Sequence, residues 1–215
     1  MSSRPSPLKS LPDGYREVYY LSVTEMAALV WLNLLSLVLL AAFALLMIAW
    51  IAGVRSLRDP YEVSAHIPGL FLWIGVFLVL PFHEWIHGLA IRWVGHRPIY
   101  GIKWAELGRV KLPLVLYTTA GDVYFRRLAF IFVALAPVVV ITLGGMAIVV
   151  FLPDYLAYYV ALAVIINGAG AVGDFWMVIV TLRYPADCLV RDEADSIRIY
   201  VRDQTTPTDL KRPEC

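Results

Sequence analysis

The sequence predicts an all-α membrane protein with four transmembrane helices, a small β-rich cytoplasmic loop and a C-terminal hairpin. Of its 215 residues, 60% are hydrophobic and only 16% are charged, which is not the composition of an ordinary soluble domain. The 18 Lys and Arg residues nearly balance the 17 Asp and Glu residues, so no basic field suggests nucleic acid as a partner. The expected partners are a lipid bilayer and a protein or peptide associated with it.

Four long uncharged stretches account for the predicted helices. A helix needs about 20 apolar residues to cross hydrocarbon about 30 Å thick. Stretches of sufficient length run from Met26 to Val54, His66 to Val94, Leu128 to Leu152 and Tyr155 to Leu182. They predict a four-helix transmembrane domain over residues 26–182, between an N-terminal segment, 1–25, and a C-terminal tail, 183–215.

The positions of Lys and Arg predict the orientation. Sixteen of the 18 lie in three parts of the chain. These are the segment before the first stretch, the region from the end of the second stretch to the start of the third, and the segment after the fourth. The two remaining connections contain only Arg55 and Arg58. Because positive residues gather on the cytoplasmic side, we expect a multi-pass protein of the cell membrane with both termini and the middle loop in the cytoplasm.

Two polar segments carry patterns typical of strands. The cytoplasmic loop, 95–125, contains two runs of β-branched, aromatic and aliphatic residues interrupted by Gly and Pro, which predict short strands or a re-entrant hairpin. In the tail, residues 197–202 alternate between aliphatic and polar side chains, the period-two pattern of a half-buried strand. Together with residues 188–191 they predict a hairpin over 188–201.

The second stretch contains ionisable residues in the order His83-Glu84-Trp85-Ile86-His87, an HExxH motif. Residues four apart lie one turn apart on the same helix face, so both imidazoles can reach one metal ion. Glu84 can then take a proton from a water molecule that the metal activates and deliver it to a leaving amine. Each ionisable group in an apolar helix costs on the order of 2.5–3.5 kcal/mol on insertion, which favours a functional role over polar contacts between helices.

A catalytic zinc ion usually has three protein ligands and one open position. The extended metzincin pattern would place a histidine ten residues after His83, but Trp93 stands there. In the other three stretches, the only acid or imidazole beyond the terminal residues is Asp174. Asp174 lies nine residues before Arg183, as His83 lies nine before Arg92, which places both at a similar depth. We therefore predict Asp174 as the third ligand.

Small and amide side chains accompany the predicted third ligand. Asn167 lies seven residues before Asp174 and thus near the same helix face. It could orient a substrate carbonyl, stabilise an oxyanion or hydrogen-bond another helix. Gly88, Gly170 and Gly173 are expected to let the second and fourth helices approach closely enough to share a metal ion.

Four segments resemble the family of small bacterial membrane proteins described as putative zincin peptidases: His83–Gly88, Ala134–Pro137, Asn167–Asp174 and Ile197–Tyr200. The resemblance covers about residues 65–202. It implies a membrane-embedded Zn²⁺ site and, by analogy with the site-2 proteases, cleavage of peptide bonds in or near the bilayer. On this resemblance His83 and His87 match the ligand histidines, Glu84 the catalytic glutamate and Asp174 the third ligand. The order Gly173-Asp174 departs from the Asp-Gly signature of site-2 proteases.

The leading hypothesis is a zinc metallopeptidase that hydrolyses peptide bonds of membrane-associated proteins near the cytoplasmic leaflet. The alternative is a non-catalytic metal-binding or metal-handling membrane protein that uses the same ligands, and a third hypothesis is a scaffold without metal. Transport usually requires a polar path through the whole bilayer, but the outer halves of the first, third and fourth stretches contain almost no charged groups. That distribution favours the enzyme.

Overall fold

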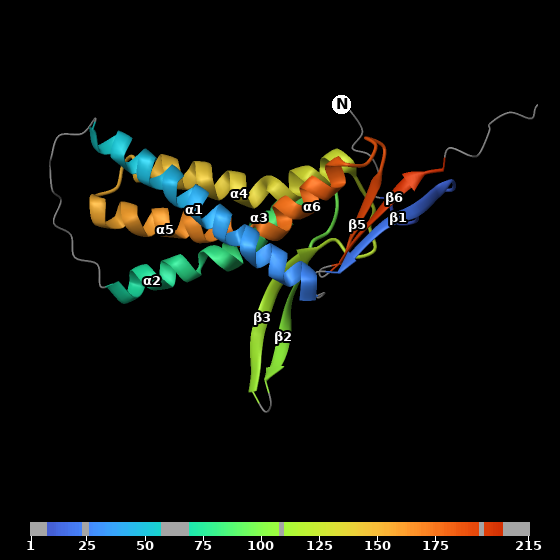
Figure 1. Cartoon of the computed structure of the whole chain (residues 1–215), viewed down its shortest axis with the longest axis horizontal. Helices are drawn as coiled ribbons and strands as arrows, with labels where there is room; N and C mark the ends of the chain where they lie inside the picture. The colour runs from blue at the N-terminus through green and yellow to red at the C-terminus, as the bar shows by residue number, and fades with distance from the viewer. Residues whose placement is uncertain (1–7, 23–25, 57–68, 108–109, 194–195, 204–215) are drawn as a thin grey trace, which may run out of the picture.

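The computed structural model describes residues 8–22, 26–56, 69–107, 110–193 and 196–203. Figure 1 shows the helices lying roughly along one long axis, with a four-stranded sheet at one end and a separate hairpin projecting near it. The helices are α1 (Met26–Ser56), α2 (Gly69–Phe77), α3 (Val79–Trp93), α4 (Arg127–Val149), α5 (Asp154–Gly170) and α6 (Val172–Leu182). The strands are β1 (Tyr15–Ser22), β2 (Ile99–Leu107), β3 (Val110–Thr119), β4 (Phe125–Arg126), β5 (Leu189–Asp192) and β6 (Ser196–Arg202).

The helices occupy the four predicted apolar stretches, but two of the stretches are interrupted. The second is divided into α2 and α3, and Pro81 has no N–H to donate to the carbonyl of Phe77, where α2 ends. The fourth is divided into α5 and α6, which are bent by 44° within a glycine-rich segment of low helix propensity. Among the described residues, three helical segments are long and apolar enough to cross a membrane: Val30–Ser56, Trp73–Trp93, which continues from α2 into α3, and Arg127–Val149. The bent α5–α6 pair makes a fourth if it forms one span.

The four-stranded sheet combines segments from three parts of the chain in the order β1-β6-β5-β4. The predicted tail hairpin is present as β5 and β6, which pair antiparallel. β1 pairs antiparallel with β6, from Tyr15 opposite Arg202 to Ser22 opposite Ser196. The sequence interpretation missed β1, because it treated residues 1–25 only as an N-terminal segment. The strand is completed by a partner more than 170 residues away.

This sheet also determines how the helices connect. β1 precedes α1, β4 precedes α4, and β5 follows α6. Because all three strands belong to one sheet, the chain must leave that end of the molecule and return to it twice. The outward helices are α1 and α4, and the returning pairs are α2–α3 and α5–α6 (Figure 1). Each of these two pairs therefore makes a single passage along the bundle.

The loop between α3 and α4 contains an antiparallel hairpin of β2 and β3, as its strand-like runs predict. Its register runs from Ile99 opposite Thr119 to Leu107 opposite Val110, with an irregularity after Lys103. β3 packs against α3 at the foot of the hairpin. The hairpin therefore lies beside the helix that carries the HExxH motif.

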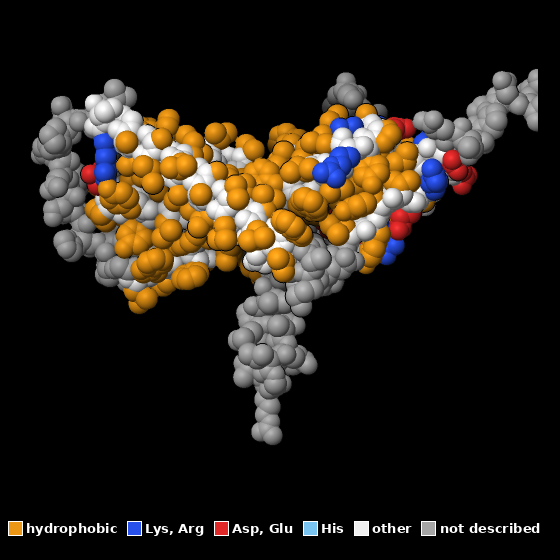
Figure 2. Space-filling model, viewed as in Figure 1, with side chains coloured by type: hydrophobic (Ala, Val, Ile, Leu, Met, Phe, Trp, Pro, Cys, Tyr) orange, Lys and Arg blue, Asp and Glu red, His pale blue; other side chains and the backbone are white. Residues whose placement is uncertain are grey.

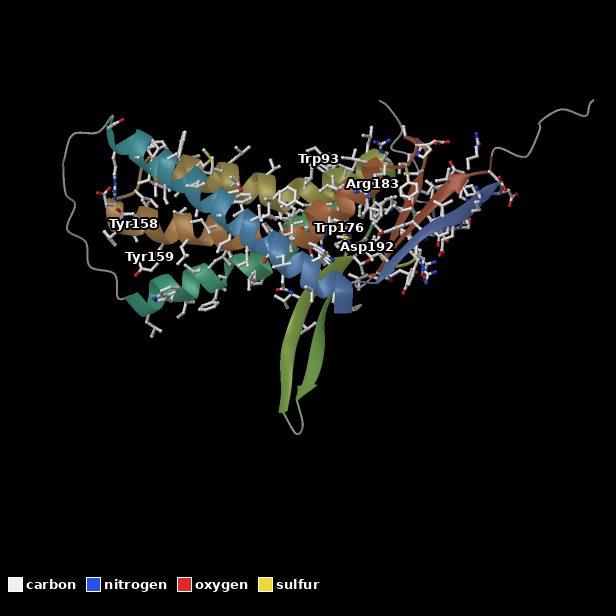
Figure 3. The ribbon with its side chains drawn as sticks, viewed as in Figure 1. Trp93, Tyr158, Tyr159, Trp176, Arg183 and Asp192 are labelled. Atoms are coloured by element: carbon white, nitrogen blue, oxygen red, sulfur yellow. The ribbon has the colours of Figure 1, made fainter. Side chains whose placement is uncertain are left out.

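The surface of the helices is apolar over most of its length. Figure 2 shows hydrophobic side chains covering the helices and charged side chains gathered toward the two ends. On α1, Trp31 is 71% exposed and Leu45 is 68% exposed, which would be costly in water across so large a surface. In Figure 3, Trp93 and Arg183 lie toward the sheet end and Tyr158 and Tyr159 at the opposite end, as expected for residues at two membrane interfaces.

Two clusters of buried side chains hold these parts together. One lies beneath the sheet and joins Phe125, Val190, Ile197 and Ile199 to α3, α4 and α6. The other lies among α1, α3, α4 and α5 and includes Met47 and Val164. At the end of the bundle remote from the sheet, Arg55 pairs with Asp154 at 3.1 Å and connects α1 to α5.

Candidate metal centre

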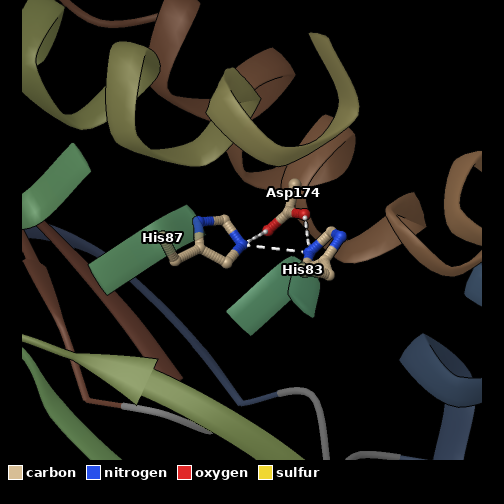
Figure 4. A group of neighbouring side chains, drawn as sticks. All are labelled: His83, His87 and Asp174. Atoms are coloured by element: carbon tan, nitrogen blue, oxygen red, sulfur yellow. Dashed lines mark hydrogen bonds and ion pairs between the residues drawn. The ribbon is translucent and has the colours of Figure 1, made fainter. Parts of the chain in front are cut away.

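Two histidines of α3 and an aspartate of α6 converge on one point inside the bundle (Figure 4). Nε2 of His83 lies 3.1 Å from Nε2 of His87 and 3.2 Å from Oδ2 of Asp174. Nε2 of His87 lies 3.5 Å from Oδ1 of the same carboxylate. Ligand atoms about 2.0–2.1 Å from a tetrahedral zinc ion are about 3.3 Å apart. Each of these separations is close to that value, with the carboxylate facing the two histidines through different oxygens.

The other ring nitrogens explain why these atoms face one another. Nδ1 of His83 lies 2.8 Å from Oδ1 of Asn167, and Nδ1 of His87 lies 3.0 Å from the carbonyl oxygen of Val133. Both oxygens accept hydrogen bonds, so each neutral imidazole carries its proton on Nδ1 and leaves a lone pair on Nε2. Two lone pairs and a carboxylate then point at a common centre.

An arrangement of acceptors suits a cation at its centre. The side chains of His83, His87 and Asp174 are only 13%, 10% and 12% exposed, so water provides little compensation. Imidazole nitrogens with one carboxylate form a ligand set that suits Zn²⁺, and outer hydrogen bonds to ligand histidines are usual at such sites. These residues therefore fit the metal that the sequence predicts.

The local fold accounts for the position of each ligand. His83 and His87 are four residues apart on α3 and thus share a face. Asp174 lies in the first turn of α6, which begins at Val172 after the bend between α5 and α6. Free N–H groups and the helix dipole favour a negative charge at a helix N-terminus. The bend thus gives the carboxylate an environment that an unbroken helix would lack.

Glu84 lies beside this centre without belonging to the converging group. Its partly buried carboxyl is close enough to interact electrostatically with His83, His87 and Asp174. The hydroxyl of Thr118 on β3 donates to the backbone carbonyl of Glu84 at 3.0 Å. The motif places Glu84 next to the three converging residues, where a proton acceptor would be needed if they held a metal ion.

Asn167, the last of the predicted residues, contacts His83 directly. It is 2% exposed and is held on α5, one turn before that helix ends. Its Oδ1 faces His83, whereas its Nδ2 has no hydrogen-bond partner among the residues that the structure describes. The hydrogen bond to Oδ1 holds the His83 ring in place. The unpaired Nδ2 group of Asn167 is suited to donate to an acceptor on a bound molecule.

The prediction for the glycines is wrong in part. Gly88 makes a close contact, but with Tyr100 of β2 rather than with α5 or α6. At Gly170 and Gly173 an added Cβ would meet no atom of the described residues within 4 Å. The close helix contacts are instead made by Gly168 against Phe43 and by Gly145 against Val164. His83, His87 and Asp174 thus meet beside the bend before α6 and not along a stripe of these glycines.

Two contributors were absent from the sequence interpretation. The Val133 carbonyl is a backbone group, and no residue type at 133 would identify it as a partner of His87. Thr118 lies on β3, in the loop between α3 and α4, and its contact with Glu84 depends on how the hairpin docks on α3. No sequence motif marks either contact.

The fold and the site define a helical protein with long apolar helices and a buried group of two histidines and one aspartate that could hold a metal ion. The sequence model of the family described as "Putative zincin peptidase" matches residues 76–189, and the chain belongs to this family. The matched segment includes α3 to α6 and all five predicted site residues. No curated protein and no solved structure matches the chain.

Proposed function

We propose that this protein is a membrane-embedded zinc metallopeptidase that hydrolyses peptide bonds of membrane-associated proteins near the cytoplasmic leaflet. The observation that carries the proposal is the convergence of His83, His87 and Asp174 beside Glu84, between helices apolar enough to cross a membrane. Membership of the zincin peptidase family supports the same chemistry. His83, His87 and Asp174 would hold Zn²⁺, and Glu84 would act as general base.

When bound, Zn²⁺ supplies a Lewis acid that polarises the scissile carbonyl and makes a nearby water molecule more acidic. Glu84 accepts a proton from the attacking water as the new C–O bond forms. It then delivers that proton to the amide nitrogen as the C–N bond breaks, so that the products are a carboxylic acid and an amine. The buried Nδ2 of Asn167 suits the carbonyl oxygen of the substrate, where negative charge develops.

The neighbouring hairpin offers a way to present the substrate. A peptide bond inside a helix is shielded, so a substrate must become extended before hydrolysis. An extended segment can pair with the backbone of an edge strand, and β2 and β3 form a two-stranded sheet in which each strand has an outer edge. Because β3 also packs on α3, a segment paired with this hairpin would lie close to Glu84.

The charge distribution supports cytoplasmic access. The sheet joins the N-terminal segment, the α3–α4 connection and the tail, which are the segments that hold most of the Lys and Arg. Under the positive-inside rule this end of the bundle faces the cytoplasm. The metal ligands lie in the second half of α2–α3 and at the start of α6, nearer the sheet end than the Arg55–Asp154 end.

The decisive experiment compares Glu84→Gln with the parent in lipid nanodiscs. The probe is a library of single-span model peptides, with products identified by mass spectrometry. We expect E84Q to retain stoichiometric zinc and to lose cleavage, whereas Glu193→Gln, the same change in the remote sheet, keeps both. Cleavage by E84Q at the parental rate would overturn the mechanism. Zinc flux into proteoliposomes that persists in E84Q and disappears in His83→Ala would favour the metal-handling alternative.

A further inference from the structure

Pro137 interrupts the hydrogen bonding of α4 beside the metal centre. It lies inside this helix and is fully buried. In an α-helix the N–H of each residue donates to the carbonyl four residues earlier, but proline has no N–H. The carbonyl without a helical donor is therefore that of Val133. In an apolar environment an unpaired carbonyl costs several kcal/mol, so Val133 requires a donor from elsewhere.

His87 supplies that donor. Its Nδ1 lies 3.0 Å from the Val133 oxygen, and the contact is buried. Only the tautomer with the proton on Nδ1 can make this hydrogen bond, and that tautomer leaves the Nε2 lone pair facing His83 and Asp174. The carbonyl needs a donor and the imidazole needs an acceptor, so one contact satisfies both.

The two ligand histidines are held by different means. His83 is held by the side chain of Asn167, which the sequence specifies directly. His87 is held by a backbone carbonyl, which every residue possesses and which an ordinary helix would already occupy. A sequence can reserve such a carbonyl by placing proline four residues later, and Pro137 stands at that position relative to Val133.

We propose that Pro137 is a positioning residue for the metal centre: by withholding an N–H from Val133, it reserves that carbonyl for His87 and holds Nε2 toward the other ligands. The proposal rests on the metal centre of the proposed function but not on peptide hydrolysis. An alanine at position 137 would supply a competing N–H along the helix axis. Because a carbonyl oxygen can accept two hydrogen bonds, we expect a weakened contact rather than its complete loss.

The test measures zinc affinity and histidine tautomers in Pro137→Ala, with the full chain in nanodiscs. Competition with a chromophoric chelator should show a zinc Kd raised about tenfold, the lower end of the range for lost outer contacts. In the metal-free protein, ¹⁵N NMR of the imidazoles should show His87 predominantly protonated on Nδ1 in the parent and mixed between Nδ1 and Nε2 in P137A. His83 should keep its parental tautomer, since Asn167 is unchanged.

Moving the proline by one residue distinguishes the effect of the free Val133 carbonyl from the effect of the helix bend. The variant P137A/V138P keeps one proline in α4 but frees the carbonyl of Ala134 in place of Val133. We expect it to bind zinc as weakly as P137A, and recovery of parental affinity would show that the bend alone matters and overturn the proposal. Parental affinity and an unchanged His87 tautomer in P137A would also overturn it. If the parent itself binds no zinc, the proposed metal centre is wrong, but the NMR comparison of P137A with the parent still tests the role of Pro137. The same comparison tests that role if P137A/V138P does not fold.

Discussion

Asn167 and His83 are 84 residues apart in the sequence, yet Oδ1 of the amide lies 2.8 Å from Nδ1 of the imidazole. This contact joins α5 to α3 and fixes which nitrogen of His83 faces His87 and Asp174. Replacing Asn167 with Leu removes the acceptor and leaves the ring free to turn. We expect the zinc Kd to rise about 10- to 100-fold, the usual effect of losing such an outer partner.

The matched variant for this first prediction is Asn167→Asp. It retains an oxygen that accepts from Nδ1, so its zinc affinity should stay closer to that of the parent. Chelator competition in nanodiscs gives both values. Equal affinities of N167L and the parent would mean that His83 is oriented without Asn167.

Asp174 supplies the only negative charge among the three converging ligands. Asp174→Asn keeps the shape of the side chain but removes its charge and makes half of its terminus a donor. We expect substoichiometric zinc after purification, measured by elemental analysis. Asp154→Asn is the control, because it makes the same change at the far end of the bundle, where Asp154 pairs with Arg55. Full zinc occupancy in D174N would remove Asp174 from the ligand set.

Glu193 makes the stability of the sheet dependent on pH. Burial opposes its ionisation, but hydrogen bonds from Arg198 and Ser196 and the charges of Arg198 and Arg191 outweigh it and hold the pKa of Glu193 below its ordinary 4.5. Near that pH the unfolded state binds more protons than the folded state. The stabilisation is therefore complete above about pH 4.5 and is lost as pH falls through the lower, folded pKa.

Glu193→Gln should accordingly lower the stability of the sheet at pH 7 by about 0.5–1 kcal/mol, as is usual for a partly exposed ion pair. Hydrogen exchange of the β5 and β6 amides measures this difference. The parent and E193Q should converge well below pH 4.5, where the parental carboxyl is also neutral. A difference that persists at such pH values would assign the effect to packing rather than to the charge.

Two adjacent glycines in α4 provide a test of helix packing. An added Cβ at Gly145 would overlap a methyl group of Val164 on α5, whereas at Gly144 it would meet no atom of the described structure within 4 Å. Gly145→Ala should lower the thermal midpoint in detergent, since overpacking typically costs about 1–3 kcal/mol. Gly144→Ala should leave the midpoint unchanged or raise it, because alanine is the better helix former. Equal midpoints would mean that α4 and α5 can separate without cost.

The sequence predicts those features of the fold that depend on composition or on helical spacing. The apolar stretches identify the helices, and the four-residue spacing of His83 and His87 places them on one face. Asp174 could be selected because so few ionisable residues lie within the apolar stretches. Each inference uses one segment at a time and needs no knowledge of how the segments pack.

Features that depend on packing were beyond such reasoning. β1 becomes a strand by pairing with β6 at the other end of the chain. The hydrogen bond from Thr118 to Glu84 follows from how the hairpin docks on α3. Pro137 was visible in the sequence, but its relation to His87 required knowing which side chain approaches Val133.

Docking of the hairpin on α3 gives the last prediction. Tyr100 and Thr118 are directly opposite in the β2–β3 register. They contact Gly88 and Glu84 respectively, which are one helical turn apart. The four residues from Glu84 to Gly88 rise about 6 Å along the helix, and opposite strand residues lie about 4.5–5.5 Å apart. The spacing of Tyr100 and Thr118 is therefore close to that of the two helix positions that they contact. An added Cβ at Gly88 would overlap the ring and hydroxyl of Tyr100.

Gly88→Ala should therefore displace the end of the hairpin that packs on α3 and weaken the hydrogen bond from Thr118 to the backbone carbonyl of Glu84. Because the three converging residues lie on α3 and α6, zinc content should remain parental while kcat falls about tenfold, as for the loss of one hydrogen bond worth about 1.4 kcal/mol. Removing the ring in G88A/Y100A makes room for the methyl group and should restore part of the rate. Gly75→Ala, which meets open space in α2, is the control. A parental rate in G88A would show that the end of the Tyr100 side chain moves aside without carrying β3 with it, and that Glu84 does not depend on the hairpin.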